Sequence, residues 1–222
     1  MHPLLAGVVG STAYGLAGPG SDVDRLGLFA APTVDLHGLH PPRESIVSTD
    51  PDQTWHEARK YCRLALSGNP TATELIWLPD DLYEVRTGLG DRLIGIRAAF
   101  LTAGRVRDAY LGYAAQQFRK IENRHAGAGE TGRRTAKHAR HLARLLHQGR
   151  RLYATGRLPI RLDDPRWYVE FGEQVAAGQL DRARALLAEA ERDFATIRSP
   201  LPERPDEPTV ERWLRDVRTA HL

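Results

Sequence analysis

The chain has 222 residues, 41% of them hydrophobic and 27% charged, which suffices for one substantial globular domain or two small ones. Lysine and arginine outnumber aspartate and glutamate by 31 to 28, a balance that permits a polyanionic partner without requiring one. The single cysteine, Cys62, excludes an intramolecular disulfide and a zinc site built from cysteines. The sequence contains no run of eighteen apolar residues, the length that could cross a membrane. We therefore expect a cytoplasmic protein with no membrane contact.

The first predicted element is a short buried strand over residues 4–9, which ends in a turn at Gly10-Ser11. A glycine at this place lets the backbone approach another group closely. The Ser11 hydroxyl and the amides of a helix beginning near Thr12 offer hydrogen-bond donors to an anion. The sequence therefore predicts a phosphate-binding turn.

A second predicted strand follows the turn Gly18-Pro19-Gly20-Ser21 and begins at Asp22-Val23-Asp24. Residues two apart on a strand share a face, so Asp22 and Asp24 are expected to point the same way. Two carboxylates aimed together repel unless a cation lies between them, and oxygen ligands favour Mg²⁺ or Mn²⁺ over zinc. The alternative is an ordinary Asx turn, which explains neither the second aspartate nor the Gly-Ser turn upstream.

Together these residues resemble a known superfamily. Gly10-Ser11, Tyr14-Gly15 and Ser21-Asp22-Val23-Asp24 are similar to the GS and DxD signature of the DNA polymerase β-like nucleotidyltransferases. The strings GSTAYGL, PGSDVDRLGLFAAPT and GNPTATELIWLP resemble the RNA-ligase-associated nucleotidyltransferases, well over residues 4–79 and more loosely beyond. The resemblance implies an α/β fold with a small mixed sheet. It also implies transfer of a nucleoside monophosphate from an NTP, with ATP favoured, to a hydroxyl acceptor, with RNA favoured and Mg²⁺ or Mn²⁺ as cofactor.

The resemblance further implies three acidic metal ligands. Asp22 and Asp24 supply two of them, and the third belongs on a strand beside the DxD strand. Asp52 matches best because it precedes a predicted short strand and a helix over residues 57–66, while Asp50 and Glu44 are the alternatives.

Other site residues follow from the same resemblance. Gly10, Ser11 and Ser21 are expected to bind the nucleotide, and Tyr14 and Asn69 are candidates for orienting the acceptor. Asn69 equally suits a second reading, as the cap of a helix that follows the stop signal Gly68-Asn69-Pro70.

From about Leu93 the spacing of apolar residues predicts helices over residues 106–121, 136–153 and 180–197, with a last short helix from Thr209. The segment 105–151 carries twelve basic residues against three acidic ones. Such a segment can bind RNA or a triphosphate, and a solvated helix face is an equally good explanation.

In the helix over residues 136–153, Lys137, His141, Arg144 and Gln148 fall on one polar face beside an apolar stripe. If that face is turned to the cleft, Lys137 and Arg144 bind the nucleotide or RNA, and His141 orients the acceptor. We expect replacement of Lys137 and Arg144 to leave folding intact, because both lie off the apolar stripe.

The predicted organisation is a nucleotidyltransferase core over residues 1–90 and a helical region over residues 91–222 that closes the cleft, with a mobile loop over 125–132. Two alternatives remain open. One is a noncatalytic RNA-binding accessory on the same scaffold. The other pairs the core with a HEPN-like ribonuclease element, for which Arg133 to His138 or Arg140 to His147 has the R-x(4-6)-H spacing. The residues leave the NTP, the acceptor, the oligomeric state and any association with an RNA ligase open.

Overall fold

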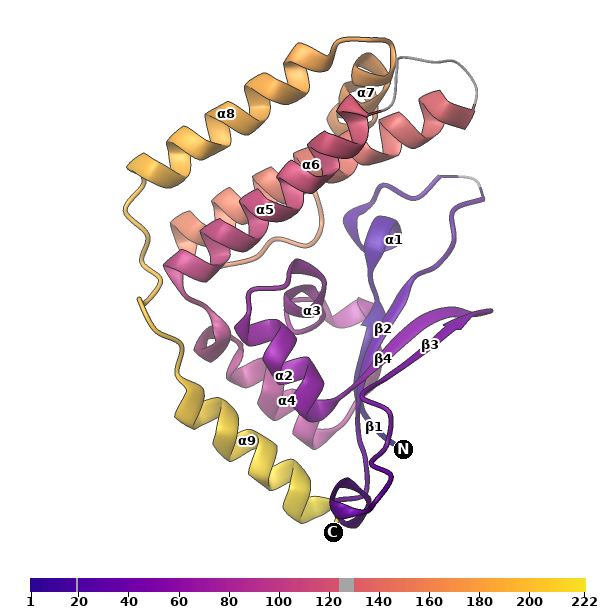
Figure 1. The fold of residues 1–222 in the computed structure, drawn as a ribbon, viewed down its shortest axis with the longest axis vertical. Helices are drawn as coiled ribbons and strands as arrows, with labels where there is room; N and C mark the ends of the chain where they lie inside the picture. Colours follow the sequence, from indigo (N-terminus) through magenta and orange to yellow (C-terminus); the bar gives the residue numbers. More distant parts are fainter. Residues whose placement is uncertain (19, 124–129) are drawn as a thin grey trace. The chain divides into compact units, whose positions relative to one another are not determined.

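A computed structural model describes residues 1–18, 20–123 and 130–222 (Figure 1). The chain forms two compact units: unit 1 contains Met1–Leu101 and Arg204–Leu222, and unit 2 contains Thr102–Glu203. Pro19 of the predicted turn and residues 125–129 of the predicted loop lie outside the described residues. In the ranges that are described, no helix is long and apolar enough to cross a membrane.

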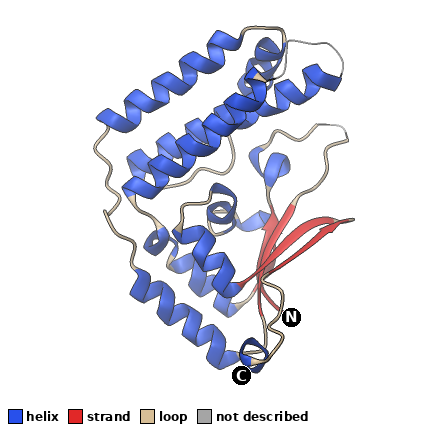
Figure 2. Cartoon of the chain, viewed as in Figure 1, coloured by secondary structure: helices blue, strands red, loops and turns tan. Residues whose placement is uncertain are grey.

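Unit 1 is built on a mixed sheet, which confirms the predicted fold class (Figure 2). In the described part of the chain this sheet has five strands in the order β3-β4-β2-β1-β5. Their bounds are β1 His2–Val8, β2 Arg25–Ala30, β3 Ser45–Thr49, β4 Asp52–Glu57 and β5 Tyr83–Arg86. Strand β2 pairs antiparallel with β1 and parallel with β4. The C-terminal end of β1 therefore lies at the same end of the sheet as the N-terminal ends of β2 and β4.

Helices cover one face of this sheet and bury its apolar residues (Figure 2). Leu5 and Leu28 of the sheet are completely buried, as are Tyr61, Leu75 and Leu93 of the helices. The helices of unit 1 are α1 Gly10–Tyr14, α2 Ala58–Leu66, α3 Pro70–Leu75, α4 Gly88–Gly95 and α9 Glu207–Ala220, with 3₁₀ turns η1 Val34–His37, η2 Asp80–Leu82 and η3 Arg97–Phe100.

Helix α9, which the sequence predicts as part of the helical region 91–222, packs within unit 1. The Arg218 guanidinium donates to the buried Glu57 carboxylate at 2.6 Å, and the second oxygen of Glu57 caps α2 by accepting from the Arg59 amide at 2.8 Å. A buried carboxylate is tolerated when it is paired in this way. The Glu57 side chain thus links the C-terminal helix to the strand that carries Asp52.

Unit 2 is helical and centred on α6 Glu130–Thr155, which packs against α5 Ala103–Glu122, α7 Pro165–Ala176 and α8 Leu180–Thr196. Helices α5 and α6 approach closely at Gly149, where an added Cβ would lie 2.6 Å from the Tyr110 side chain. The three predicted long helices are present, whereas α7 was not predicted. Its start carries a usable signal, because Asp164 caps the helix and Pro165 occupies the first turn.

Two further differences concern unit 1. Strand β5 was not predicted, because it has only four residues, two of them charged, and lies at an edge of the sheet. The second strand begins at Arg25 and not at Asp22. The ladder between β1 and β2 cannot continue further, because β1 gives way to α1 at Gly10.

The approach of α5 and α6 predicts opposite effects for two helical glycines. Gly149→Ala should destabilise the protein by about 1–3 kcal/mol, because the new methyl group overlaps the Tyr110 ring. Gly112→Ala, on an exposed part of α5 with nothing within 4 Å of the new Cβ, should stabilise it by up to about 1 kcal/mol. Urea denaturation of both variants measures the difference, and equal stabilisation would contradict the close packing.

Candidate functional site

The turn at Gly10 lies directly against the carboxylate of Asp24. Gly10 has φ +68°, a conformation that L side chains rarely adopt, and a Cβ built on it would lie 2.1 Å from Oδ2 of Asp24. The Val9 amide donates to the Asp24 carbonyl at 2.9 Å, which extends the pairing of β1 and β2 by one step. The structure therefore brings the Gly-Ser turn and the second aspartate of the DxD motif together.

Asp22 is exposed and belongs to the loop that enters β2. The expectation that strand geometry aims Asp22 and Asp24 the same way is therefore wrong, because the strand begins only after them. Ser21 shapes this loop: its amide donates to the Gly18 carbonyl at 3.0 Å, and its hydroxyl accepts from the Gly18 amide at 2.9 Å. The carboxylates are thus presented by a loop closed through Ser21.

The sheet register separates Glu44 from Asp52, but not Asp50, which lies in the turn between β3 and β4 just before Asp52. The parallel ladder between β2 and β4 begins with the pair Arg25 and Gln53. Asp24 and Asp52 each come one residue before this pair, so they lie at the same end of the two strands. Glu44 lies at the other end of β4, since its carbonyl accepts from the Glu57 amide at 2.9 Å. Its carboxylate forms ion pairs with Arg59 and Arg63 at 3.3 and 3.1 Å. The register favours Asp52 over Glu44, and its catalytic role remains a prediction.

The acidic residues suit a divalent ion that is bound together with a nucleotide. Among the described residues, no three His, Cys, Asp or Glu side chains lie close enough together to hold a metal ion, so Asp22, Asp24 and Asp52 do not form one cluster. Mg²⁺ is commonly held by one or two carboxylates, with waters and substrate phosphates as its remaining ligands. Asp22 and Asp24 fit that kind of donor set.

The two candidate acceptor-orienting residues of unit 1 both make hydrogen bonds within it. The Tyr14 hydroxyl donates to Oε2 of Glu74 at 2.6 Å, and both side chains are buried. Asn69 Oδ1 accepts from the Ala72 amide at 3.0 Å, which confirms the cap that the sequence allows at the start of α3. For Glu74 the sequence leaves open whether it matches the family as a site residue or has only a structural role. The available signal was a carboxylate among apolar residues in GNPTATELIWLP, which must be buried with a partner.

In unit 2 the predicted polar face of α6 is largely buried. Arg144 is 2% exposed and Gln148 is 1% exposed, whereas Lys137 is exposed. Arg144 donates to Gln148 Oε1 at 2.6 Å, and Gln148 donates to the Pro159 carbonyl at 2.8 Å. The expectation that Arg144 can be replaced without affecting folding is therefore wrong. With α5, α7 and α8 packed around it, α6 buries polar residues as well as its apolar stripe.

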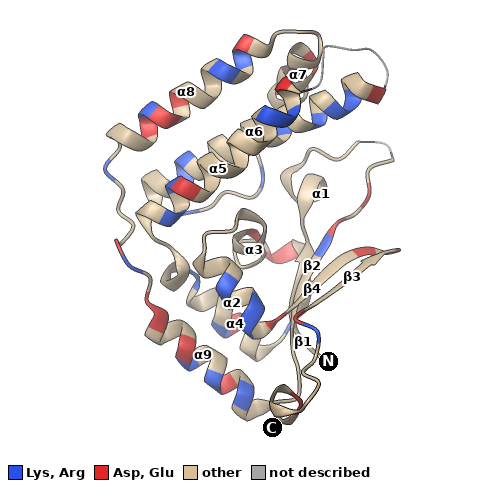
Figure 3. Ribbon diagram, in the orientation of Figure 1, with Lys and Arg blue, Asp and Glu red and all other residues tan. Residues whose placement is uncertain are grey.

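His141 is surrounded by positive charge. Burial, together with the nearby Arg144, His138, Lys120 and Lys137, lowers the pKa of His141 from 6.5 to about 3. The imidazole is therefore neutral at physiological pH. The blue segments of the α5 and α6 ribbons in Figure 3 mark positions of lysine and arginine.

The histidines of the two R-x(4-6)-H candidates take part in contacts between helices of unit 2. His138 Nδ1 lies 2.8 Å from Oε1 of Gln117 on α5, and His147 Nδ1 lies 2.6 Å from the Tyr168 hydroxyl on α7. These contacts are what structural histidines make. The ribonuclease alternative remains a prediction with no specific geometry in its favour.

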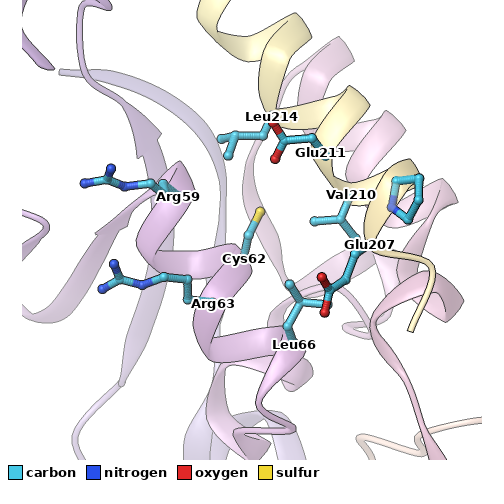
Figure 4. A pocket seen from close by; sticks show the side chains of 9 residues that line it. Arg59, Cys62, Arg63, Leu66, Glu207, Val210, Glu211 and Leu214 are labelled. Atoms are coloured by element: carbon cyan, nitrogen blue, oxygen red, sulfur yellow. The ribbon is translucent and has the colours of Figure 1, made fainter. Parts of the chain in front are cut away.

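A groove of about 510 Å³ lies between α2 and α9 in unit 1 (Figure 4). Its lining combines apolar and charged side chains from both helices: Arg59, Cys62, Arg63, Leu66, Glu207, Pro208, Val210, Glu211 and Leu214. It includes none of the predicted site residues, so it does not bear on the nucleotide site.

A family model described as RlaP, the RNA repair pathway DNA polymerase beta family, matches residues 2–215. The match and the mixed sheet with its Gly-Ser turn and DxD loop identify a DNA polymerase β-like protein. The chain belongs to the RNA repair pathway DNA polymerase beta family, which confirms the resemblance found in the sequence. No curated protein matches the sequence.

The contact of Gly10 with Asp24 predicts a selective effect of an added methyl group. Gly10→Ala should destabilise the protein by about 1–3 kcal/mol more than Gly20→Ala. Both glycines have positive φ, but the new Cβ at position 20 has nothing within 4 Å. Thermal unfolding of the two variants makes the comparison, and equal losses would mean that Asp24 does not crowd the turn.

The lowered pKa of His141 predicts a pH dependence of stability. Between its ordinary pKa of 6.5 and its folded-state pKa of about 3, the unfolded state binds more protons, so stability falls as the pH is lowered. From pH 6.5 to about pH 5 this residue should contribute a loss of about 1.5 kcal/mol. His141→Gln should lack that contribution, while all other titrating groups cancel in the comparison. Denaturant titrations at both pH values test it, and parallel pH profiles would contradict it.

Proposed function

We propose that this chain is a metal-dependent nucleotidyltransferase that moves a nucleoside monophosphate from an NTP, with ATP favoured, to a hydroxyl group of RNA. The observation that carries the proposal is the contact between Gly10 and Asp24. It puts a backbone turn without a side chain next to a carboxylate, which is the arrangement needed to hold a triphosphate beside its metal ion. Membership of a DNA polymerase β-like family supports the same reaction class.

In the proposed reaction the acceptor oxygen attacks the α-phosphorus, the bond from that phosphorus to the bridging oxygen of the β-phosphate breaks, and pyrophosphate leaves. Gly10 and Ser11 bind the phosphates, so that the attacking and leaving oxygens are in line. Asp22 and Asp24 hold Mg²⁺ or Mn²⁺, which neutralises charge on the phosphates. Asp52, next to Asp24 in the sheet register, accepts the proton of the acceptor hydroxyl.

RNA is proposed as the acceptor on two grounds. The family is described as belonging to an RNA repair pathway. The segment 105–151 is strongly basic, and Lys137 within it is exposed, as a residue that contacts phosphate must be.

Ligand-dependent stability tests the proposal. Mg²⁺ or Mn²⁺ together with an NTP should stabilise the wild-type protein, by about 2.7 kcal/mol at one hundred times the dissociation constant. The variant Asp22→Asn/Asp24→Asn should gain no stability from metal and NTP, because it lacks the carboxylates that would hold the ion. Thermal melts with each NTP measure both effects, and labelled NTP with total RNA measures transfer.

The matched control is Asp35→Asn/Asp163→Asn, which removes the same charge at two exposed positions outside the site. This control should respond to metal and NTP as wild type does. Absence of any shift in wild type, with every divalent ion and every NTP, would refute the assignment. Transfer to protein and not to RNA would refute only the acceptor.

A further inference from the structure

Glu74 is a buried carboxylate in an apolar setting. It is 2% exposed and lies in α3 beside Leu75 and Ile76, both completely buried. The Tyr14 hydroxyl donates to its Oε2 at 2.6 Å, a short hydrogen bond to a charged acceptor. Because a buried carboxylate is costly, its presence calls for a role that an apolar residue at this position could not perform.

Helix α3 is a firm support for this carboxylate. Asn69 caps its first turn, the Tyr61 hydroxyl donates to the Ala72 carbonyl at 2.8 Å, and the Tyr83 hydroxyl donates to the Leu75 carbonyl at 2.8 Å. These bonds tie α3 to α2 and to β5. Glu74 is therefore held by backbone that is fixed from several directions.

Helix α1, on the other side of the hydrogen bond, cannot be stable by itself. It has five residues and no side-chain cap at its start, and helices of that length are not stable in isolation. Its first two residues are Gly10 and Ser11, and its last is Tyr14. The Tyr14 hydroxyl thus joins the helix that forms the phosphate-binding turn to the fixed support of α3.

We infer that Glu74 is a positioning residue for the nucleotide site: through Tyr14 it fixes α1, and with it the Gly10-Ser11 turn against Asp24. This inference rests on the proposed function. It gives the Tyr14 hydroxyl the role of fixing α1, and not the role of orienting the acceptor. It also gives a physical reason for Glu74, which lies far from Gly10 in the sequence, to be needed by the same site.

The test compares Tyr14→Phe with Tyr61→Phe. Each variant removes one buried hydroxyl that is hydrogen-bonded to α3, but only Tyr14 belongs to α1. Amide hydrogen exchange over residues 10–16 should be about tenfold faster in Tyr14→Phe than in Tyr61→Phe. In the transfer reaction, kcat should fall about tenfold or more in Tyr14→Phe, with a smaller change in KM, because the phosphates are bound but misaligned.

Conservative replacement separates positioning from simple packing. Glu74→Gln keeps an oxygen that can accept from Tyr14 and should retain most of the kcat, whereas Glu74→Leu should match Tyr14→Phe. Equal exchange over residues 10–16 in Tyr14→Phe and Tyr61→Phe, or equal kcat, would overturn the inference. A wild-type protein that transfers nothing would refute the proposed function. The hydrogen-exchange comparison alone would then test whether Tyr14 and Glu74 fix α1.

Discussion

The contact between the Gly10 backbone and the Asp24 carboxylate constrains the rest of unit 1. No side chain larger than hydrogen fits between them. The positive φ of Gly10 turns the chain away from the direction of β1 directly after that strand ends. This turn ends the ladder between β1 and β2 at Val9 and Asp24. The aspartate loop must therefore approach β2 without a strand partner, which leaves its carboxylates outside the regular sheet.

Both units bury polar groups that make hydrogen bonds. Glu57 caps α2 and pairs with Arg218, Glu74 accepts from Tyr14, and Arg144 donates to Gln148. Burial of such groups is favourable only with well-placed partners, so they specify one arrangement more than they add stability. In unit 1 these bonds join α1 to α3, and α9 to the start of α2.

Much of the fold and part of the site could be predicted. Strong periodicity located the three long helices, and the string Gly68-Asn69-Pro70 located the boundary between α2 and α3. The edge strand Tyr83–Arg86 has too few residues for its periodicity to be recognised. Amphipathic spacing on α6 separates polar from apolar positions, but it does not report how many neighbours surround a helix. For that reason Arg144 was expected on the surface and is buried.

The sequence by itself determined the family, the mixed α/β class and the candidate acids Asp22 and Asp24, because the turn residues and their order along the chain are local features. Only the tertiary structure decided which distant groups meet. The parallel register of β2 and β4 put Asp52, and not Glu44, at the same end of the sheet as Asp24. A hydrogen bond between α1 and α3 joined Tyr14 to Glu74 across sixty positions of sequence. Such pairings depend on strand order and helix packing, which no local pattern of residues encodes.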